Sequence, residues 1–288
     1  MRPAHLTKFL HFGLIGFPLG HSLSPRLHQA ALKHYHLEGE YQLYPVEPLP
    51  QGKSGLVSLL GRIRGGELDG LNVTIPHKQS VLDLVDELTP AANLIGAVNT
   101  IINRDGKLVG DNTDAPGFWA EIEALWGCKN PARALVLGSG GGARAVVYSL
   151  AAHDWEITIA AARPEDIPQA NKLASDLSKV GGRLDVVELN ESISGRFASV
   201  ALVVNTTPLG MSPNKDASPW PEGCPFPPAC KVFDIVYNPL ETRLVASARA
   251  AGIPAETGLG MLICQAALAF ERWTGLPAPF DVMRRSVN

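Results

Sequence analysis

Residues 134–143 read Ala134-Leu-Val-Leu-Gly-Ser-Gly-Gly-Gly-Ala143, a short apolar run that ends in a glycine-rich turn. The apolar run is typical of a buried strand, and the residues from Ala145 to Ala151 are typical of a helix. The turn fits the pattern G-x-G-x-x-A, in which glycines let the backbone approach a pyrophosphate at a helix N-terminus. The residues concerned are Gly138, Gly140, Gly141, Gly142 and Ala143. The sequence thus predicts a dinucleotide cofactor here, and an ordinary strand-to-helix turn is the alternative.

The same alternation of strands and helices continues after this turn. Apolar runs of strand length, mostly separated by segments of helix length, occupy residues 156–160, 184–188, 200–204 and 232–236. This pattern predicts a doubly wound parallel sheet of the Rossmann type. Residues 212–228 are rich in proline and predict a surface loop, whereas residues 258–274 predict a long apolar helix.

The first part of the chain alternates in the same way. It contains strand-like runs at residues 12–16, 41–46 and 71–75, a helix that opens at Ser24, and an amphipathic pattern that predicts a helix at residues 81–88. The fold class is therefore α/β with parallel sheets. A chain of 288 residues with 45% hydrophobic content is long enough for two modest domains.

Bulk composition excludes several classes of protein. The formal net charge is −3 without a long run of one sign, which argues against nucleic acid and membrane surfaces as partners. No run approaches the roughly 20 apolar residues of a membrane span. The cysteines show neither zinc-ligand spacing nor a disulfide pattern, so we expect no metal and a reducing cytoplasm. The sequence leaves a monomer and a homodimer open.

Three polar segments each lie at the end of an apolar run: Asn72-Val-Thr-Ile-Pro-His-Lys78, Ala97-Val-Asn-Thr100 and Gly110-Asp-Asn-Thr-Asp114. An ammonium beside a carboxylate can move a proton on and off an alcohol oxygen while amides hold neighbouring hydroxyls. We therefore predict redox chemistry on a polyhydroxylated small molecule, with Lys78 and Asp114 as the proton-transfer groups. Lys78 is expected in the first turn of a helix, where the macrodipole disfavours a cation, so it needs a compensating anion. The alternatives are an exposed lysine and an aspartate that only caps a helix.

Other polar residues indicate where ligands would be held. Ser22 and Ser24 lie two apart on a segment that we expect to be extended, so both hydroxyls face one way ahead of a helix N-terminus, which suits a carboxylate. An ordinary N-cap is the alternative for Ser24. Gln265 interrupts an apolar helix and needs either a ligand or the backbone as partner.

Arg163 ends the second strand of the predicted Rossmann sheet. No carboxylate precedes Glu165, whereas an NAD site usually has an acidic residue there for the ribose hydroxyl. A guanidinium suits a 2′-phosphate, so the sequence favours NADP over NAD. A solvated surface arginine is the alternative.

With these residues in place, the chain resembles the shikimate dehydrogenase family over nearly its full length. Beside the glycine-rich turn and the three polar segments, the matching segments are Gly16-Phe-Pro-Leu-Gly-His-Ser-Leu-Ser-Pro-Arg-Leu-His28, Asn205-Thr-Thr-Pro-Leu-Gly-Met211, Asp234-Ile-Val-Tyr-Asn-Pro239 and Gly258-Leu-Gly-Met-Leu-Ile-Cys-Gln-Ala-Ala267. The family commonly has Asn-Arg-Thr where this chain has Ala162-Arg163-Pro164, followed by Glu165 and Asp166.

The resemblance implies an activity and a role for each matching residue. Residues 1–113, completed by 258–288, would form a substrate-binding domain, and residues 114–257 an NADP-binding Rossmann domain. The activity would be the reversible reduction of 3-dehydroshikimate to shikimate in aromatic amino-acid biosynthesis, with Lys78 and Asp114 as the catalytic pair. The substrate would be held by Ser22, Ser24, Asn72, Thr74, Asn99, Tyr237 and Gln265. Beyond the glycine-rich turn, NADP would contact Arg163, Thr206, Met211 and Gly258.

Three other functions stay open at this point. A quinate/shikimate dehydrogenase of relaxed specificity would use NAD, and the serine pair and Arg163 argue against it. A non-catalytic sensor would bind the same ligands, but it would not need the intact Lys78 and Asp114. A fold-related methylene-folate dehydrogenase would not need the Ser22-x-Ser24 carboxylate site.

Overall fold

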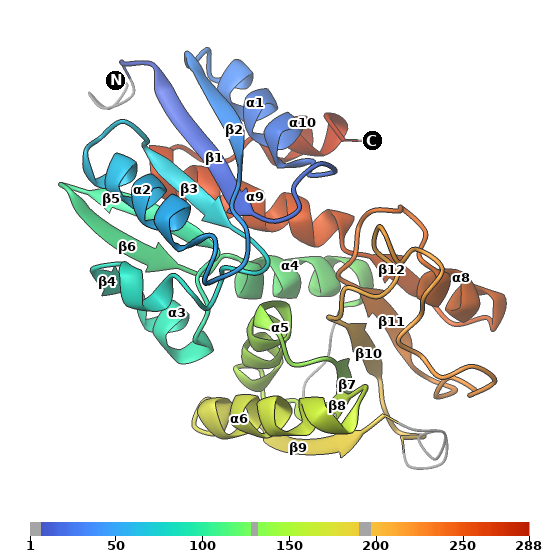
Figure 1. The fold of residues 1–288 in the computed structure, drawn as a ribbon. Helices are drawn as coiled ribbons and strands as arrows, with labels where there is room; N and C mark the ends of the chain where they lie inside the picture. The colour runs from blue at the N-terminus through green and yellow to red at the C-terminus, as the bar shows by residue number, and fades with distance from the viewer. Residues whose placement is uncertain (1–6, 128–131, 190–196, 288) are drawn as a thin grey trace. The chain divides into compact units, whose positions relative to one another are not determined.

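The computed structural model describes residues 7–127, 132–189 and 197–287. The chain divides into two compact units (Figure 1): unit 1 comprises residues 1–117 and 262–288, and unit 2 comprises residues 118–261. The divisions fall inside helices α4 (Asp114–Trp126) and α9 (Leu259–Thr274), a few residues after the domain ends at 113 and 257 that the sequence suggested. Asp114 therefore belongs to unit 1, and Gly258 belongs to unit 2.

Unit 1 is built on a six-stranded sheet with the strand order β2-β1-β3-β5-β6-β4. The strands are β1 (Leu10–Gly16), β2 (Gly39–Pro45), β3 (Gly70–Val73), β4 (Glu87–Leu88), β5 (Thr100–Arg104) and β6 (Lys107–Asp111). β1 is parallel to β2 and β3, whereas β5 is antiparallel to both β3 and β6. The sequence analysis expected parallel sheets, but β5 and β6 are antiparallel because the two-residue connection between them, residues 105 and 106, leaves no room for a crossover helix.

Helices cover both faces of this sheet because side chains alternate along β1. Ile15 joins a core with Leu56, Leu60 and Ile63 of α2 (Lys53–Arg64). Phe12 points to the other face, where its ring stacks on Trp273 of α9 at a centroid distance of 4.7 Å. The remaining helices of unit 1 are α1 (Ser24–His34), α3 (Pro90–Ile95) and α10 (Phe280–Arg285).

The helix predicted at residues 81–88 is wrong. The segment forms a short 3-10 helix, η2 (Leu82–Leu84), and then the strand β4, which pairs with β6. Val81 is buried in the core of unit 1, and Leu82, Leu84, Val85 and Leu88 pack against that core. The apolar pattern thus predicted correctly which residues are buried. It did not predict their backbone structure, which is a 3-10 turn followed by a short strand rather than one helix.

Unit 2 is a six-stranded sheet in which every strand is parallel to its neighbours, in the order β12-β11-β10-β7-β8-β9. The strands are β7 (Arg133–Leu137), β8 (Glu156–Ala161), β9 (Arg183–Glu188), β10 (Leu202–Asn205), β11 (Lys231–Asp234) and β12 (Ala255–Thr257). The order reverses between β7 and β10, which is the arrangement that creates a ligand crevice at the carboxyl ends of a doubly wound sheet. The predicted Rossmann-type sheet is confirmed.

Apolar clusters lie on both faces of the sheet in unit 2. One face packs against α5 (Gly141–Ala151) and α6 (Ile167–Leu177) through Val146, Leu150 and Leu173. The other face packs against α8 (Arg243–Ala250) and against Trp220. Trp220 belongs to residues 212–228, which contain neither helix nor strand, as the sequence predicted.

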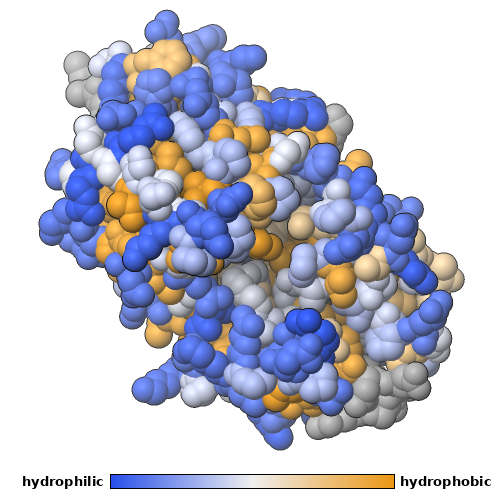
Figure 2. All heavy atoms as spheres, in the orientation of Figure 1, coloured by the Kyte–Doolittle hydropathy of each residue, from blue (hydrophilic) through white to orange (hydrophobic). Residues whose placement is uncertain are grey.

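The surface of the protein is mainly hydrophilic on the face seen in Figure 2. On the face seen in Figure 2, polar and charged side chains dominate, and apolar ones form small separate patches. Within the part of the chain that the structure describes, no helix combines the length and the hydrophobicity needed to traverse a bilayer.

Gly70 offers a test of the packing in unit 1. A Cβ atom at Gly70 would overlap the indole of Trp273, whose Nε1 donates to Ile101 O at 3.0 Å. We expect Gly70→Ala to lower the free energy of unfolding by about 1–3 kcal/mol, the usual effect of overpacking. Gly61→Ala is the matched control, because it lies inside α2 with nothing within 4 Å and should stabilise by about 0.5–1 kcal/mol. Urea unfolding curves would measure both, and a neutral Gly70→Ala would contradict the packing.

Candidate functional site

Lys78 and Asp114 form a close ion pair in unit 1. The distance from Lys78 Nζ to Asp114 Oδ2 is 2.6 Å, and the side chains are only 16% and 8% exposed. Lys78 lies in a turn after β3, where its carbonyl accepts a hydrogen bond from Val98 N at 2.8 Å. It does not lie in a helix, so the macrodipole argument made from the sequence is wrong. Asp114 is the first residue of α4. Because both side chains are largely buried, separating them would leave each with an uncompensated charge.

Asn99 fixes the carboxylate of Asp114. Its Nδ2 donates to Asp114 Oδ1 and Thr113 Oγ1, both at 2.9 Å, and more weakly to Gln265 Oε1 at 3.3 Å. Its Oδ1 accepts from Thr113 N at 2.7 Å. Asp114 is thus held through both oxygens, one by an amide and one by an ammonium, while Lys78 keeps further N–H donors for a ligand.

Gln265 joins α9 to this group within unit 1. Its Nε2 donates to Leu262 O at 2.8 Å, and its Oε1 accepts from Asn99. The sequence left a ligand and the backbone open as its partner, and the structure gives it a backbone carbonyl together with a side-chain amide. The Oε1 atom stays close to the Lys78 and Asp114 group, so Gln265 belongs to the same site.

Asn72 is also buried, but its hydrogen-bonding groups are used within unit 1. Its Oδ1 accepts from Tyr41 OH at 2.9 Å, and its Nδ2 donates to Thr100 Oγ1 at 3.1 Å and to Asn99 O at 3.2 Å. Tyr41 stacks face to face on His28, whose pKa burial lowers to about 3, so this ring is neutral near pH 7. Asn72 therefore fixes the backbone of Asn99 rather than facing a ligand with free donors.

Asn112 and Asp111 are structural residues of this site that the sequence did not single out for these roles. Asn112 Oδ1 accepts from Ala115 N at 3.2 Å in the first turn of α4, and its Nδ2 donates to Ala97 O at 2.9 Å. Asp111 Oδ2 accepts from Arg272 Nε at 3.0 Å, which ties β6 to α9. A polar residue just before a helix is the signal that could have found Asn112.

Ser22 precedes α1, Ser24 is the first residue of α1, and Thr74 directly follows β3. The segment between the serines is not extended, because Leu23 has φ −86° and ψ −8° and Ser24 N donates to Ser22 Oγ at 3.3 Å. Ser24 is the first residue of α1 and its side chain does not cap the helix, so the N-cap alternative is wrong. Thr74 N donates to Ile15 O at 2.8 Å, which holds Thr74 against the end of β1.

The glycine-rich turn in unit 2 has the geometry of an anion cradle. Gly138 has φ +103°, which side chains rarely adopt, and a Cβ there would lie 2.9 Å from Thr207 Cγ2. Gly140 precedes α5 and has open space around it, and no side chain caps the first turn of α5. The backbone N–H groups of residues 141–143 are therefore free of a side-chain cap and can face a pyrophosphate, so this turn fits a dinucleotide.

Thr206, Met211, Tyr237 and Gly258 lie around the carboxyl ends of β10 and β11 in unit 2. Thr206 Oγ1 donates to Leu137 O at 2.6 Å, so its hydroxyl is bound to the end of β7. Met211 and Tyr237 are half-buried. Gly258 N donates to Val236 O at 3.2 Å, and a Cβ at Gly258 would overlap the backbone of Ile235. Gly258 and Tyr237 are thereby brought to one edge of the sheet.

Arg163 follows β8 in unit 2 and is 65% exposed. Its Nε and Nη2 donate to the two oxygens of Asp166, both at 2.9 Å, and its Nη1 lies 3.4 Å from Glu165 Oε1. The guanidinium is therefore an exposed cation paired with two carboxylates of the turn that follows β8.

Asp234 is a fully buried carboxyl group at the end of β11. It accepts from Thr242 Oγ1 at 2.7 Å, Asn205 Nδ2 at 2.8 Å and Val236 N at 3.0 Å. Burial outweighs these hydrogen bonds and raises its pKa to about 6. Asp234 thus links Asn205 at the end of β10 and Thr242 at the start of α8 to the end of β11.

Asp234 makes the stability of the chain depend on pH. A pKa of about 6 in the folded chain against 3.8 in the unfolded chain means that the folded chain binds the proton more tightly. The contribution of this group to the free energy of unfolding is full below pH 4 and is lost as the pH rises through 6. From pH 4 to pH 7 the parent should therefore lose roughly 2 kcal/mol of its free energy of unfolding relative to Asp234→Asn. Urea unfolding at several pH values measures this shift, and parallel profiles would contradict it.

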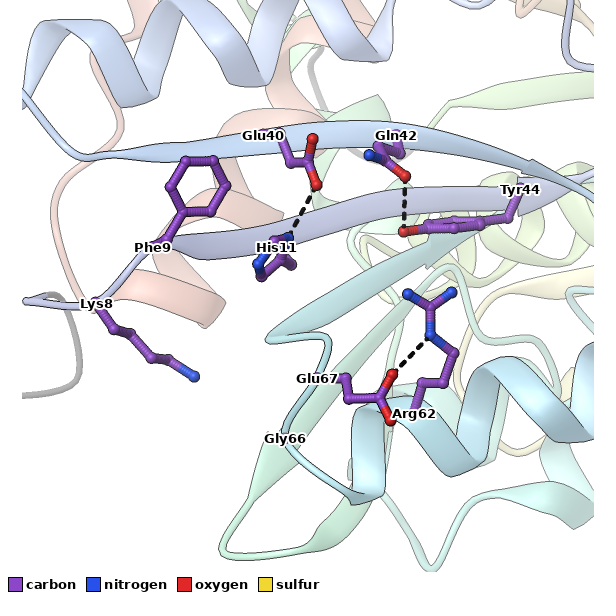
Figure 3. Close-up of a pocket in the computed structure, with 9 residues that line it drawn as sticks. All are labelled: Lys8, Phe9, His11, Glu40, Gln42, Tyr44, Arg62, Gly66 and Glu67. Atoms are coloured by element: carbon purple, nitrogen blue, oxygen red, sulfur yellow. Dashed lines mark hydrogen bonds and ion pairs between the residues drawn. The ribbon is translucent and has the colours of Figure 1, made fainter.

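Two other features of the surface carry no site. A pocket of about 500 Å³ lies beside β1, β2 and α2 in unit 1 (Figure 3). Its polar side chains already have partners: His11 Nδ1 lies 2.9 Å from Glu40 Oε1, Arg62 Nε donates to Glu67 Oε2 at 3.2 Å, and Lys8 Nζ lies 2.6 Å from Asp69 Oδ1. Across the described residues, no group of three or more His, Cys, Asp or Glu side chains could hold a metal ion.

Comparison with known proteins gives a consistent result. Residues 14–101 match the family described as the shikimate dehydrogenase substrate binding domain, and residues 258–287 match the shikimate 5'-dehydrogenase C-terminal domain. The chain is 41% identical over 281 residues to shikimate dehydrogenase (NADP(+)) of Methanopyrus kandleri, covering 96% of this chain and 93% of the relative.

Solved structures match at similar coverage. Shikimate 5-dehydrogenase of Thermus thermophilus, in complex with NADP(H) and shikimate, has a TM-score of 0.83 and 38% identity over 96% of this chain and 98% of that one. Quinate dehydrogenase of Corynebacterium glutamicum, in complex with NAD, has a TM-score of 0.84 and 32% identity over 97% of this chain and 99% of that one.

Proposed function

Because this chain belongs to the shikimate dehydrogenase family, we propose that it catalyses the reversible, NADP-dependent reduction of 3-dehydroshikimate to shikimate. The observation that carries the proposal is the buried contact of 2.6 Å between Lys78 and Asp114, with Asn99 on the second carboxylate oxygen. Because this ammonium is already positioned and largely removed from water, it can donate a proton directly to an oxygen atom of a bound ligand. We propose that the protein works in the cytoplasm, in line with the spacing of its cysteines, which shows no disulfide pattern.

The reaction needs a group that stabilises charge on the substrate oxygen. Bound NADPH supplies a hydride to the carbonyl carbon. Negative charge then develops on the ketone oxygen, and Lys78 stabilises it and donates a proton to it. Asp114 orients Lys78 and accepts a hydrogen bond from the adjacent hydroxyl. Asn99 keeps Asp114 in place, and in the reverse direction Lys78 accepts the proton of the alcohol.

The remaining residues bind rather than react. We assign the substrate carboxylate to the hydroxyls of Ser22 and Ser24. Thr74, Asn99 and Gln265 contact the ring hydroxyls, and Asn72 positions Asn99 because its own amide groups are already bonded. The turn from Gly138 to Ala143 would hold the pyrophosphate of the cofactor and Arg163 its 2′-phosphate. Thr206 would also contact the cofactor, and Met211 and Gly258 would lie near the nicotinamide.

A dehydrogenase for quinate with NAD is the second candidate, and the Corynebacterium glutamicum structure supports considering it. Arg163 favours the 2′-phosphate of NADP, because the first carboxylates near it come from the turn that follows β8 rather than from the strand itself. A turnover assay that crosses shikimate and quinate with NADP and NAD separates the two. We expect the highest kcat/KM for shikimate with NADP. No turnover with any pair would contradict a dehydrogenase and favour a sensor.

The catalytic pair is tested by mutation. Lys78→Ala should lower kcat by about 10²–10⁴-fold, the usual loss when proton transfer is removed, and should change the shikimate KM much less. Asp114→Asn should lower kcat and also raise KM, because Asp114 contacts a hydroxyl. The double mutant should lose far less activity than the product of the two single effects.

The matched control for Lys78→Ala is Lys107→Ala. Lys107 is also paired with a carboxylate in unit 1, at 2.8 Å from Glu87, but its side chain is 68% exposed. Its replacement should leave kcat unchanged. Full activity in Lys78→Ala, or strictly multiplicative losses in the double mutant, would refute the paired mechanism.

A further inference from the structure

We propose that Asp166 is an internal competitor for the 2′-phosphate of the cofactor at Arg163, and that it limits the preference of this chain for NADP over NAD. The inference rests on the proposed function, because it assumes that Arg163 binds the 2′-phosphate. Asp166 is then a specificity-determining residue that acts by occupying the arginine when the phosphate is absent.

The first support is the geometry of the pair. Asp166 Oδ2 accepts from Arg163 Nε and Asp166 Oδ1 accepts from Arg163 Nη2, each at 2.9 Å. This is the two-point arrangement in which a guanidinium also binds phosphate. Asp166 thus occupies a two-point edge of the guanidinium, so a 2′-phosphate must either displace Asp166 or bind at the Nη1 side, where Glu165 lies 3.4 Å away.

The second support is the position of the carboxylate. Asp166 immediately precedes α6, where an aspartate commonly accepts a hydrogen bond from the first turn, yet its side chain makes no such cap. The carboxylate points instead to Arg163. Glu165 adds a second negative charge 3.4 Å from Nη1, so a phosphate at Arg163 meets repulsion from two carboxylates of one turn.

The third support is the link to the glycine-rich turn. The 3-10 helix η3 (Pro164–Asp166) leads directly into α6, and Gln169 Nε2 of α6 donates to Ser139 O at 3.2 Å. Leu137 and Ala160, at the ends of β7 and β8, are partners in the sheet. The Arg163 turn and the pyrophosphate turn are therefore held at neighbouring strand ends, where the adenosine end of a dinucleotide is expected.

The test measures binding of adenosine 2′,5′-bisphosphate and of adenosine 5′-phosphate by titration calorimetry at low ionic strength, so that it does not depend on turnover. Asp166→Asn should tighten binding of the bisphosphate by roughly three- to tenfold and leave the monophosphate unchanged. Glu165→Gln should act in the same direction but less, because Glu165 reaches one nitrogen. The ratio of kcat/KM for NADP to that for NAD should rise in parallel.

Asp185→Asn is the matched control. Asp185 is an exposed carboxylate of unit 2 that also pairs with an arginine, at 3.2 Å from Arg183 Nε, and its replacement should change neither affinity. Asp166→Ser, which can cap α6, should reproduce the result of Asp166→Asn. Unchanged discrimination in both Asp166 variants, or an equal gain for both nucleotides, would overturn the proposal.

Arg163→Ala separates this proposal from the proposed function. If Arg163→Ala abolishes the preference for the bisphosphate while Asp166→Asn has no effect, the cofactor assignment holds and the competition is wrong. If Arg163→Ala leaves the preference intact, Arg163 does not bind the 2′-phosphate, and both the assignment and the competition fail.

Discussion

Asn99 has one amide nitrogen and one carbonyl oxygen, and unit 1 uses both to join segments that are far apart in the chain. The nitrogen reaches Asp114 of α4 and Gln265 of α9, and the oxygen accepts the backbone N–H of Thr113. A buried amide cannot leave these groups unsatisfied without a large loss of free energy. The position of the Asp114 carboxylate, and with it the position of Lys78, therefore depends on this one side chain.

In unit 2, too, buried polar side chains join separate segments through hydrogen bonds, here at the carboxyl ends of the strands. Asp234 and Asn205 are buried and bonded to each other and to Thr242, and this network fixes the ends of β10 and β11. The glycine-rich turn and Arg163 lie at the ends of β7 and β8. Strand ends that are fixed by hydrogen bonds allow a few side chains and backbone N–H groups to be held in position for a ligand before it binds.

Much of this molecule could be predicted from local sequence. Apolar periodicity predicted β1, β2 and β3 of unit 1, β7 to β11 of unit 2 and the long helix α9, because burial on two faces leaves continuous apolar runs. It predicted neither β4 nor the antiparallel β5. The glycine-rich turn was recognisable because only glycine suits the backbone at Gly138. The helix predicted at residues 81–88 was wrong because apolar spacing indicates which residues are buried but not whether they pair with a strand.

The sequence by itself determined the α/β class, the chemistry of the polar residues and the family, because these depend on residue types and on spacings within short segments. Only the tertiary structure decided which polar groups meet. Lys78 and Asp114 are 36 positions apart, and Asn99 and Gln265 are 166 apart. It also decided that Asn72 faces Tyr41 and that Asp166 occupies Arg163. Such contacts depend on how strands and turns are packed, and no local pattern records the partner that a buried or charged side chain finds.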